Sequence, residues 1–354
     1  MIGLPPFLSF SENERILQLK ILMIILRTVK NISSLNIAAS VLLFLAAILA
    51  AVVANSSLSP VYQDFLLQEL HLRIGNFNLF SHGGHPLKMI EFINDCLMTV
   101  FFLAVGLEIK RELLVGELSS VRKAALPFIA ACGGMVVPVV IYALSVASGT
   151  PETRGMAIPM ATDIAFSLGV LSLLGKRVPL SLKIFLTAFA VVDDIGGILV
   201  IALFYSADVA YGYLIAAAVL YVFLYYMGKF GVTQKIFFLF FGVIIWYLFL
   251  QSGIHSTISG VILAFVIPAR PRLDAGKYIE RIRDIIGEFP VSKSDNIVLT
   301  NAQIATLKQV ERASDYVISP LQSLEDNLHG AVSFVILPLF AFANAGVVFS
   351  GSGS

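Results

Sequence analysis

Four aspartates lie inside stretches of sequence that carry no other charge: Asp193 and Asp194 within residues 184–205, Asp163 within 156–175 and Asp95 within 92–107. Each stretch comes close to the length that an α-helix needs to cross a bilayer, about 20 residues. A carboxylate at membrane depth is costly unless it has a partner or water, so such residues often mark functional sites. The four aspartates therefore predict a binding site or path for a cation or a proton.

The adjacent pair, Asp193 and Asp194, has the most specific chemistry. Neighbouring residues of a helix point about 100° apart, so the two carboxylates face different directions. In a low-dielectric environment they do not both ionise easily, so at least one holds a proton near neutral pH. Carboxylate oxygens also suit hard cations. The pair predicts a site where protons compete with Na⁺ or Li⁺; the alternative is a pair that only hydrogen-bonds neighbouring helices.

A proline precedes the third aspartate. Pro159 lacks an N–H and clashes with the preceding turn, so the helix is expected to break or kink between residues 155 and 159. Broken backbone at membrane depth is tolerated where it lines a cavity. Thr162 and Asp163 would then add oxygen ligands beside exposed backbone dipoles. An ordinary proline kink with a satisfied Asp163 is the alternative.

Other polar residues near these stretches have weaker signals. Glu108, Lys110, Arg111 and Glu112 follow the uncharged run 92–107, and this mixture of charges could attract cations and respond to pH. Such a cluster is more often an interfacial helix cap. His255 is the one histidine within an expected span, where a packing role is more common than proton transfer.

The composition indicates a membrane protein. Hydrophobic residues make up 58% of the 354 residues and charged residues 13%, far from the balance of soluble domains. The formal net charge of +1 gives no support for a nucleic-acid partner. Cys96 and Cys132 fall within apolar runs, so no disulfide scaffold or redox site is expected. Charged residues interrupt the N-terminal apolar stretch, which is not typical of a secretory signal peptide.

Length and lack of charge predict nine membrane-spanning helices, at residues 35–54, 92–107, 124–147, 156–175, 184–205, 210–228, 236–251, 252–268 and 331–350. The fold class is thus an all-α polytopic membrane protein. Residues 1–34 form an N-terminal segment, 35–268 hold eight spans, 269–330 form a long loop, and 351–354 follow the ninth span.

The basic residues predict the orientation. With the N-terminus in the cytoplasm, alternating loops place 21 of the 24 Lys and Arg residues inside, which agrees with the positive-inside rule. The long loop 269–330 is then cytoplasmic. In the first outer loop, apolar and polar residues alternate around Gly75-Asn76, which predicts a short β-hairpin; a flexible loop is the alternative.

Five motifs closely resemble those of the NhaA-type bacterial sodium/proton antiporters, and they occur in that family's order. They are VGLEIKRE (105–112), ATDIAF (161–166), VDDIG (192–196), SGIH (252–255) and LFAFANAG (339–346). The resemblance implies an inverted-repeat transporter architecture, of which this family is itself a known example. It also implies an inner-membrane antiporter that exchanges cytoplasmic Na⁺ or Li⁺ for external protons, with no enzymatic activity and no cofactor.

The resemblance also implies roles for particular residues. Asp193 and Asp194 are expected to bind the cation and protons, with Thr162 and Asp163 close to them in a broken helix. The charged residues after the second span are expected to form a pH-responsive cluster with Glu325 and His329. The outer hairpin is expected to form a homodimer contact.

The family has twelve helices, so this chain is expected to lack the last three. An inactive remnant or a non-transporting membrane protein is therefore a second interpretation. An intramembrane aspartyl protease is a third, because that chemistry also needs two membrane carboxylates. It needs them on facing helices, however, and gives no role to the adjacent pair.

Overall fold

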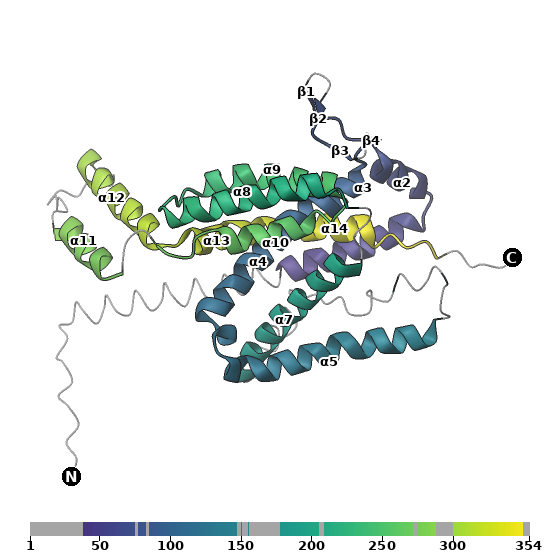
Figure 1. Ribbon diagram of the computed structural model, residues 1–354, viewed down its shortest axis with the longest axis horizontal. Coiled ribbons are helices and arrows are strands. Elements are labelled where there is room, and N and C mark those ends of the chain that lie inside the picture. Colours follow the sequence, from purple (N-terminus) through teal and green to yellow (C-terminus); the bar gives the residue numbers. More distant parts are fainter. Residues whose placement is uncertain are drawn as a thin grey trace, which may run out of the picture.

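The computed structural model describes residues 38–74, 77–82, 85–146, 150, 155, 178–204, 209–271, 275–287 and 300–349 (Figure 1). Five helical segments in this part of the chain are long and apolar enough to cross a membrane: Met89–Val115, Val121–Ser145, Tyr211–Lys229, Lys235–Ser252 and Pro320–Asn344. A sixth is added if the helix Ala38–Ala54 and α2 (Ser59–Leu67), bent by 113°, count as one span. The chain is therefore an all-α, multi-pass membrane protein.

Two of these segments contain a π-helical stretch. The first consists of α3 (Met89–Glu91), the π-helix Phe92–Leu97 and α4 (Met98–Val115). The last consists of α13 (Pro320–Ala331), the π-helix Val332–Ile336 and α14 (Leu337–Asn344). Pro338 follows the second π-helix, and it cannot donate to the preceding turn. Such π-bulges are often found at functional sites.

The remaining helices complete the bundle. They are α5 (Val121–Ser145), α7 (Leu180–Phe204), α8 (Tyr211–Lys229), α9 (Lys235–Ser252), α10 (Thr257–Val266), α11 (Ala275–Gly287) and α12 (Asn301–Val317). Buried residues of α4, α8, α9, α10 and α13 form the largest apolar cluster among the residues that the structure describes. Helices α5 and α7 pack against each other beside this group, and α7 also contacts α4 (Figure 1).

Small residues allow α4 and α10 to approach closely. A Cβ atom at Gly260 of α10 would overlap the carbonyl oxygen of Thr99 on α4. A Cβ atom at Gly106 of α4 would lie 2.8 Å from that of Ala264. Backbone contact between small residues is a common basis of helix association in membranes.

The outer surface of the bundle is apolar, as expected for helices that face lipid. On α8, for example, Ile215 and Val219 are 65% and 62% exposed, while Leu224 is fully buried. Helices that cross a bilayer satisfy their backbone groups internally and can expose apolar side chains to hydrocarbon. The exposed apolar residues therefore support a membrane environment.

Two short antiparallel strand pairs lie between α2 and α3. Strand β1 (Arg73–Ile74) pairs with β2 (Phe77–Asn78), and β3 (Ser81–His82) pairs with β4 (His85–Pro86). The first pair flanks the expected turn at Gly75-Asn76, which itself lies outside the described residues. The hairpin therefore stays a prediction.

Several helix bounds differ from those expected. The span expected at 92–107 continues to Val115, because the charged residues after Leu107 find partners and remain helical. The span expected at 252–268 is only the ten-residue α10. Helix α9 includes Ser252, and Gly253, with a left-handed φ of 80°, follows its end.

The last span also differs. It was expected at 331–350, but it begins at Pro320 and ends at Asn344. Ser319 caps its start, because the side-chain oxygen accepts a hydrogen bond from the Gln322 N–H. The span expected at 156–175, with its break near Pro159, lies outside the described residues, and the count of nine spans stays a prediction.

Candidate functional site

The adjacent acids lie near the middle of α7. Asp193 is only 5% exposed, and Asp194 is partly buried. The helix is 25 residues long, about 37 Å at 1.5 Å per residue, which exceeds the hydrocarbon thickness of a bilayer. The carboxylates are thus far from either end of a long apolar helix.

Two faces of α7 are occupied by described neighbours. Val191 packs in one cluster with Val105 and Ile109 of α4. On another face, a Cβ atom at Gly196 would overlap the thioether sulfur of Met135 on α5. These contacts fix the rotation of α7 relative to its two neighbours.

This rotation determines where the carboxylates point. At about 100° per residue, the order around the helix is Val191, Gly196, Asp193 and Asp194, so both acids lie in the sector that faces neither α4 nor α5. That sector also holds Ala190, which is 6% exposed. The two carboxylates therefore lie about 100° apart within this sector of α7, where Asp193 is buried and Asp194 is partly buried.

Thr162 and Asp163, predicted to join these acids, lie outside the described residues. Among the residues that the structure describes, no group of three or more His, Cys, Asp or Glu side chains is arranged to hold a metal ion. Asp193 and Asp194 could supply carboxylate oxygens to a hard cation, which usually takes more oxygen ligands than two carboxylates provide.

The structure brings most of the predicted charged cluster together at the end of α4. Arg111 Nε lies 3.1 Å from Glu325 Oε1 on α13, and Arg111 Nη2 lies 3.6 Å from Glu112 Oε1. The Nε–H is not aligned for a hydrogen bond with its neighbour, so the contact with Glu325 is an ion pair. Glu108 lies within electrostatic range of Arg111, Glu112 and His329.

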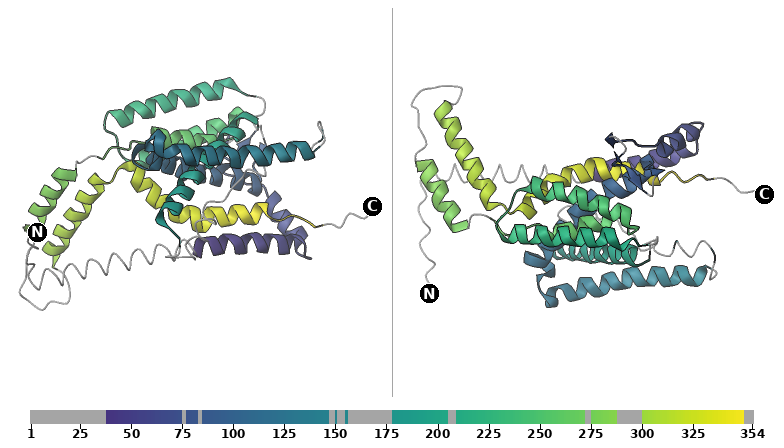
Figure 2. Two further views of the ribbon diagram at one scale, coloured as in Figure 1. Left: turned by 90° about the horizontal axis from the view of Figure 1, so that it is seen from below. Right: turned by 45° about the horizontal axis from the view of Figure 1, so that its top comes forward.

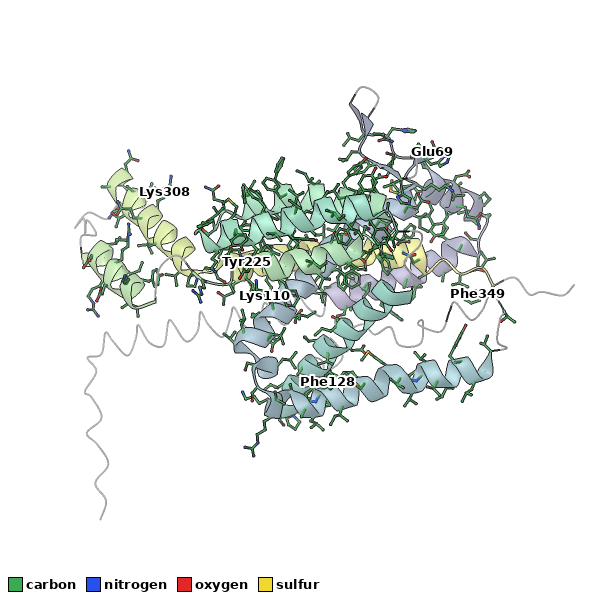
Figure 3. The ribbon with its side chains drawn as sticks, in the orientation of Figure 1. Glu69, Lys110, Phe128, Tyr225, Lys308 and Phe349 are labelled. Atoms are coloured by element: carbon green, nitrogen blue, oxygen red, sulfur yellow. The ribbon has the colours of Figure 1, made fainter. Side chains whose placement is uncertain are left out.

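Lys110 points to a different partner. Its ammonium group donates hydrogen bonds to the carbonyl oxygens of Phe265 (2.8 Å), Ala264 (3.3 Å) and Ile267 at the C-terminus of α10. These carbonyls have no partner within their helix, and the negative end of the helix dipole favours a cation there. Lys110, which is labelled in Figure 3, therefore links α4 to α10.

Asp95 and His255 lie together at the opposite end of α4. Asp95 is within the π-helix Phe92–Leu97, and its carboxylate accepts a hydrogen bond from Ser256 at 3.1 Å. Nearby, His255 Nδ1 lies 2.8 Å from the hydroxyl oxygen of Thr257. Both residues line a cavity of about 580 Å³ at the base of the strand pairs, together with Glu69, His82, His85 and Glu91.

Sequence reasoning missed the partners of the Asp95 backbone. Its carbonyl oxygen accepts hydrogen bonds from the side chains of Thr99, Trp246 (3.1 Å) and Ser256 (3.2 Å). The π-helical hydrogen-bond pattern changes which carbonyls the helix satisfies internally. No sequence signal predicted this π-helix, although the single tryptophan of the chain could have indicated a buried donor.

Comparison with known proteins agrees with this arrangement. The family model described as Na⁺/H⁺ antiporter 1 matches residues 30–354. A Na⁺/H⁺ antiporter NhaA of Bacteroides thetaiotaomicron is 76% identical over 331 residues, which cover 94% of this chain and 75% of the relative. Antiporters of the same name from Phocaeicola vulgatus and Porphyromonas gingivalis are 63% and 47% identical, over 85% and 92% of this chain and 67% and 73% of the relatives.

The residues matched by the family model include the aspartates, the charged cluster and the strand pairs. The chain therefore belongs to the NhaA family of Na⁺/H⁺ antiporters.

Proposed function

We propose that the chain exchanges Na⁺ for protons at a site centred on Asp193 and Asp194. The observation that carries this proposal is the position of the pair: adjacent, near the middle of α7, with Asp193 5% exposed. A buried carboxylate of this kind needs either a proton or a cation as its partner. Exchange of one for the other follows directly from that need.

Competition for the pair couples the two ions. When Na⁺ or Li⁺ binds between the carboxylates it displaces protons, and when protons return they release the cation. If the loaded and the protonated forms each open alternately to the two sides, one gradient drives the other without ATP. Relatives named as Na⁺/H⁺ antiporters match most of this chain, and this match favours ion exchange over a non-transporting remnant.

Thr162 and Asp163 complete the site in this proposal. The sector of α7 that holds the two acids faces neither α4 nor α5, and the proposal puts Thr162 and Asp163 beside it. A hydroxyl and a third carboxylate would raise the number of oxygen ligands toward that preferred by hard cations.

The cluster of Glu108, Arg111, Glu112, Glu325 and His329 is proposed to make exchange depend on pH. Its charges come from both α4 and α13, and the Arg111–Glu325 ion pair connects these helices. Protonation of a carboxylate in such a pair removes an attraction between two helices. Since α4 packs against α7, a shift of α4 at the charged cluster can alter the surroundings of Asp193 and Asp194.

We place the chain in the bacterial inner membrane with a cytoplasmic N-terminus, on the basis of the positive-inside asymmetry. The strand pairs between α2 and α3 then lie outside and provide the contact of a homodimer. Their short two-residue ladders leave edges that can pair with a second copy.

The proposal is tested in liposomes that contain the purified protein and a pH-sensitive dye. An imposed Na⁺ gradient should move protons with the wild-type protein but not with Asp193→Asn or Asp194→Asn. Asp64→Asn is the matched control, because Asp64 is exposed in α2. Proton movement by both site variants at the wild-type rate would contradict the assignment.

A further inference from the structure

Helices α11 and α12 form a helical hairpin that extends from the end of the bundle. The two helices contact each other. Both lie beyond the end of the bundle at which α8 ends and α13 begins (Figure 1). In the second view of Figure 2 they lie obliquely across that end, beyond the ends of α8 and α9. Because α8 and α9 can cross the membrane, the hairpin lies at a membrane boundary.

Short connections hold this hairpin near the membrane boundary. Helix α12 ends at Val317, and α13 begins at Pro320 as part of a segment able to cross the bilayer. At its other end, α11 begins at Ala275, and eight residues separate it from Val266, the last residue of α10. The hairpin therefore enters and leaves the bundle at one membrane surface.

Helix α11 exposes apolar side chains that the described part of the protein does not cover. Ile279 and Ile286 are 58% and 60% exposed. They are seven residues apart and therefore lie on the same face of the helix. Ile282 and Tyr278 lie beside this face and are only partly buried.

The charges of α11 are arranged around this apolar face. Arg283 is one turn from Ile279 and is exposed next to the apolar stripe, whereas Glu280 and Asp284 lie further around the helix. Residues 270–287 contain five basic and three acidic side chains. An apolar stripe flanked by arginine is typical of helices that lie in the lipid interface, where the cation meets anionic headgroups.

We propose that α11 docks on the anionic lipid surface of the leaflet at which α10 ends, with Ile279 and Ile286 inserted at the level of the headgroups. Helix α12 supports α11 from its other side. The chain thereby gains a lateral contact with lipid outside its membrane-spanning helices, separate from the acids of α7.

The test measures where α11 lies in the full-length protein. Cys96 and Cys132 are replaced by alanine, and a cysteine is introduced by Ile279→Cys and labelled with an environment-sensitive dye. The matched control is Glu280→Cys, one residue away on a different face. The proteins are placed in nanodiscs of phosphatidylethanolamine with phosphatidylglycerol, or of phosphatidylcholine alone, with spin-labelled lipid as quencher.

Docking predicts at least threefold stronger quenching at position 279 than at 280 in the anionic nanodiscs, and weaker quenching at 279 in phosphatidylcholine. Equal quenching at both positions, with the dye open to water-soluble quenchers, would overturn the proposal. Protection of position 279 from water-soluble quenchers without quenching by spin-labelled lipid would also overturn it, because a second copy or another protein segment would then cover the face. Ile286→Cys provides the same comparison if Ile279→Cys fails to fold.

Discussion

The ammonium nitrogen of Lys110 lies 2.8 Å from the carbonyl oxygen of Phe265. This contact joins the charged end of α4 to the C-terminus of α10, two helices that also approach closely through glycine and alanine. A lysine in a charged motif thus serves as the cap of a helix distant in the sequence.

Removal of the Lys110 ammonium should loosen the end of α10. Lys110→Met leaves three carbonyl groups without their donor, at a cost of about 2 kcal/mol in local stability. Hydrogen exchange of the Ile267 amide, which donates to Leu263 in the last turn, should accelerate. Lys229→Met is the control, because Lys229 is exposed at the end of α8; equal acceleration in both variants would refute the capping role.

The Arg111–Glu325 ion pair should appear as an energetic coupling. In a double-mutant cycle with Arg111→Gln and Glu325→Gln, the effects on thermal stability should differ from additivity by about 0.5–3 kcal/mol. Asp326→Asn changes the next acid on α13 and should couple weakly with Arg111→Gln. Additive effects at 111 and 325 would show that the pair does not hold α4 and α13 together.

The close approach of α4 and α10 predicts a steric effect. Gly260→Ala places a methyl group against the Thr99 carbonyl and should destabilise the protein by about 1–3 kcal/mol. Gly212→Ala is the contrasting change, since no atom lies within 4 Å of a Cβ there. Unfolding in detergent should begin at a lower temperature for the first variant only, and an unchanged melting temperature would exclude tight packing.

Tyr62 connects α2 to the end of α14. Its hydroxyl donates to the Phe342 carbonyl at 2.6 Å, with the Ala343 carbonyl at 3.2 Å. Tyr62→Phe should cost about 1–2 kcal/mol because these oxygens lose a buried donor. Tyr211→Phe, at a 72% exposed position of α8, should leave the melting temperature unchanged. If the two variants melt alike, this bond does not stabilise the junction.

Spans without internal charge could be predicted closely from the sequence. The span expected at 210–228 is α8, Tyr211–Lys229, because hydrophobicity alone decides its bounds. The uncharged run of the second span ends at 107, whereas the helix continues to Val115. Arg111 and Lys110 remain helical there through partners on α13 and α10 that only the fold supplies.

The sequence contains a local signal for the start of the last span. Ser319 followed by Pro320 is a helix-start pattern, an N-cap residue with proline at the first helical position. The π-helices had no comparable signal, because they depend on donors from other helices, such as Trp246 and Ser256 at Asp95.

The sequence predicts which residues form the candidate site but not the directions in which their side chains point. The motif identified Asp193 and Asp194, but the sector into which they point follows from contacts of Val191 with α4 and of Gly196 with α5. Those contacts join residues more than 50 positions apart, which one sequence cannot reveal.

The most direct test of the account is whether Na⁺ and protons compete for the same two carboxylates. Na⁺ is added to purified protein in weakly buffered detergent solution, and the released protons are measured with a pH electrode. The wild-type protein and the Asp64→Asn control should release protons in a saturable manner, whereas the double variant Asp193→Asn/Asp194→Asn should release none. Unchanged saturable release from the double variant would contradict the account, because the exchanging protons would then reside elsewhere.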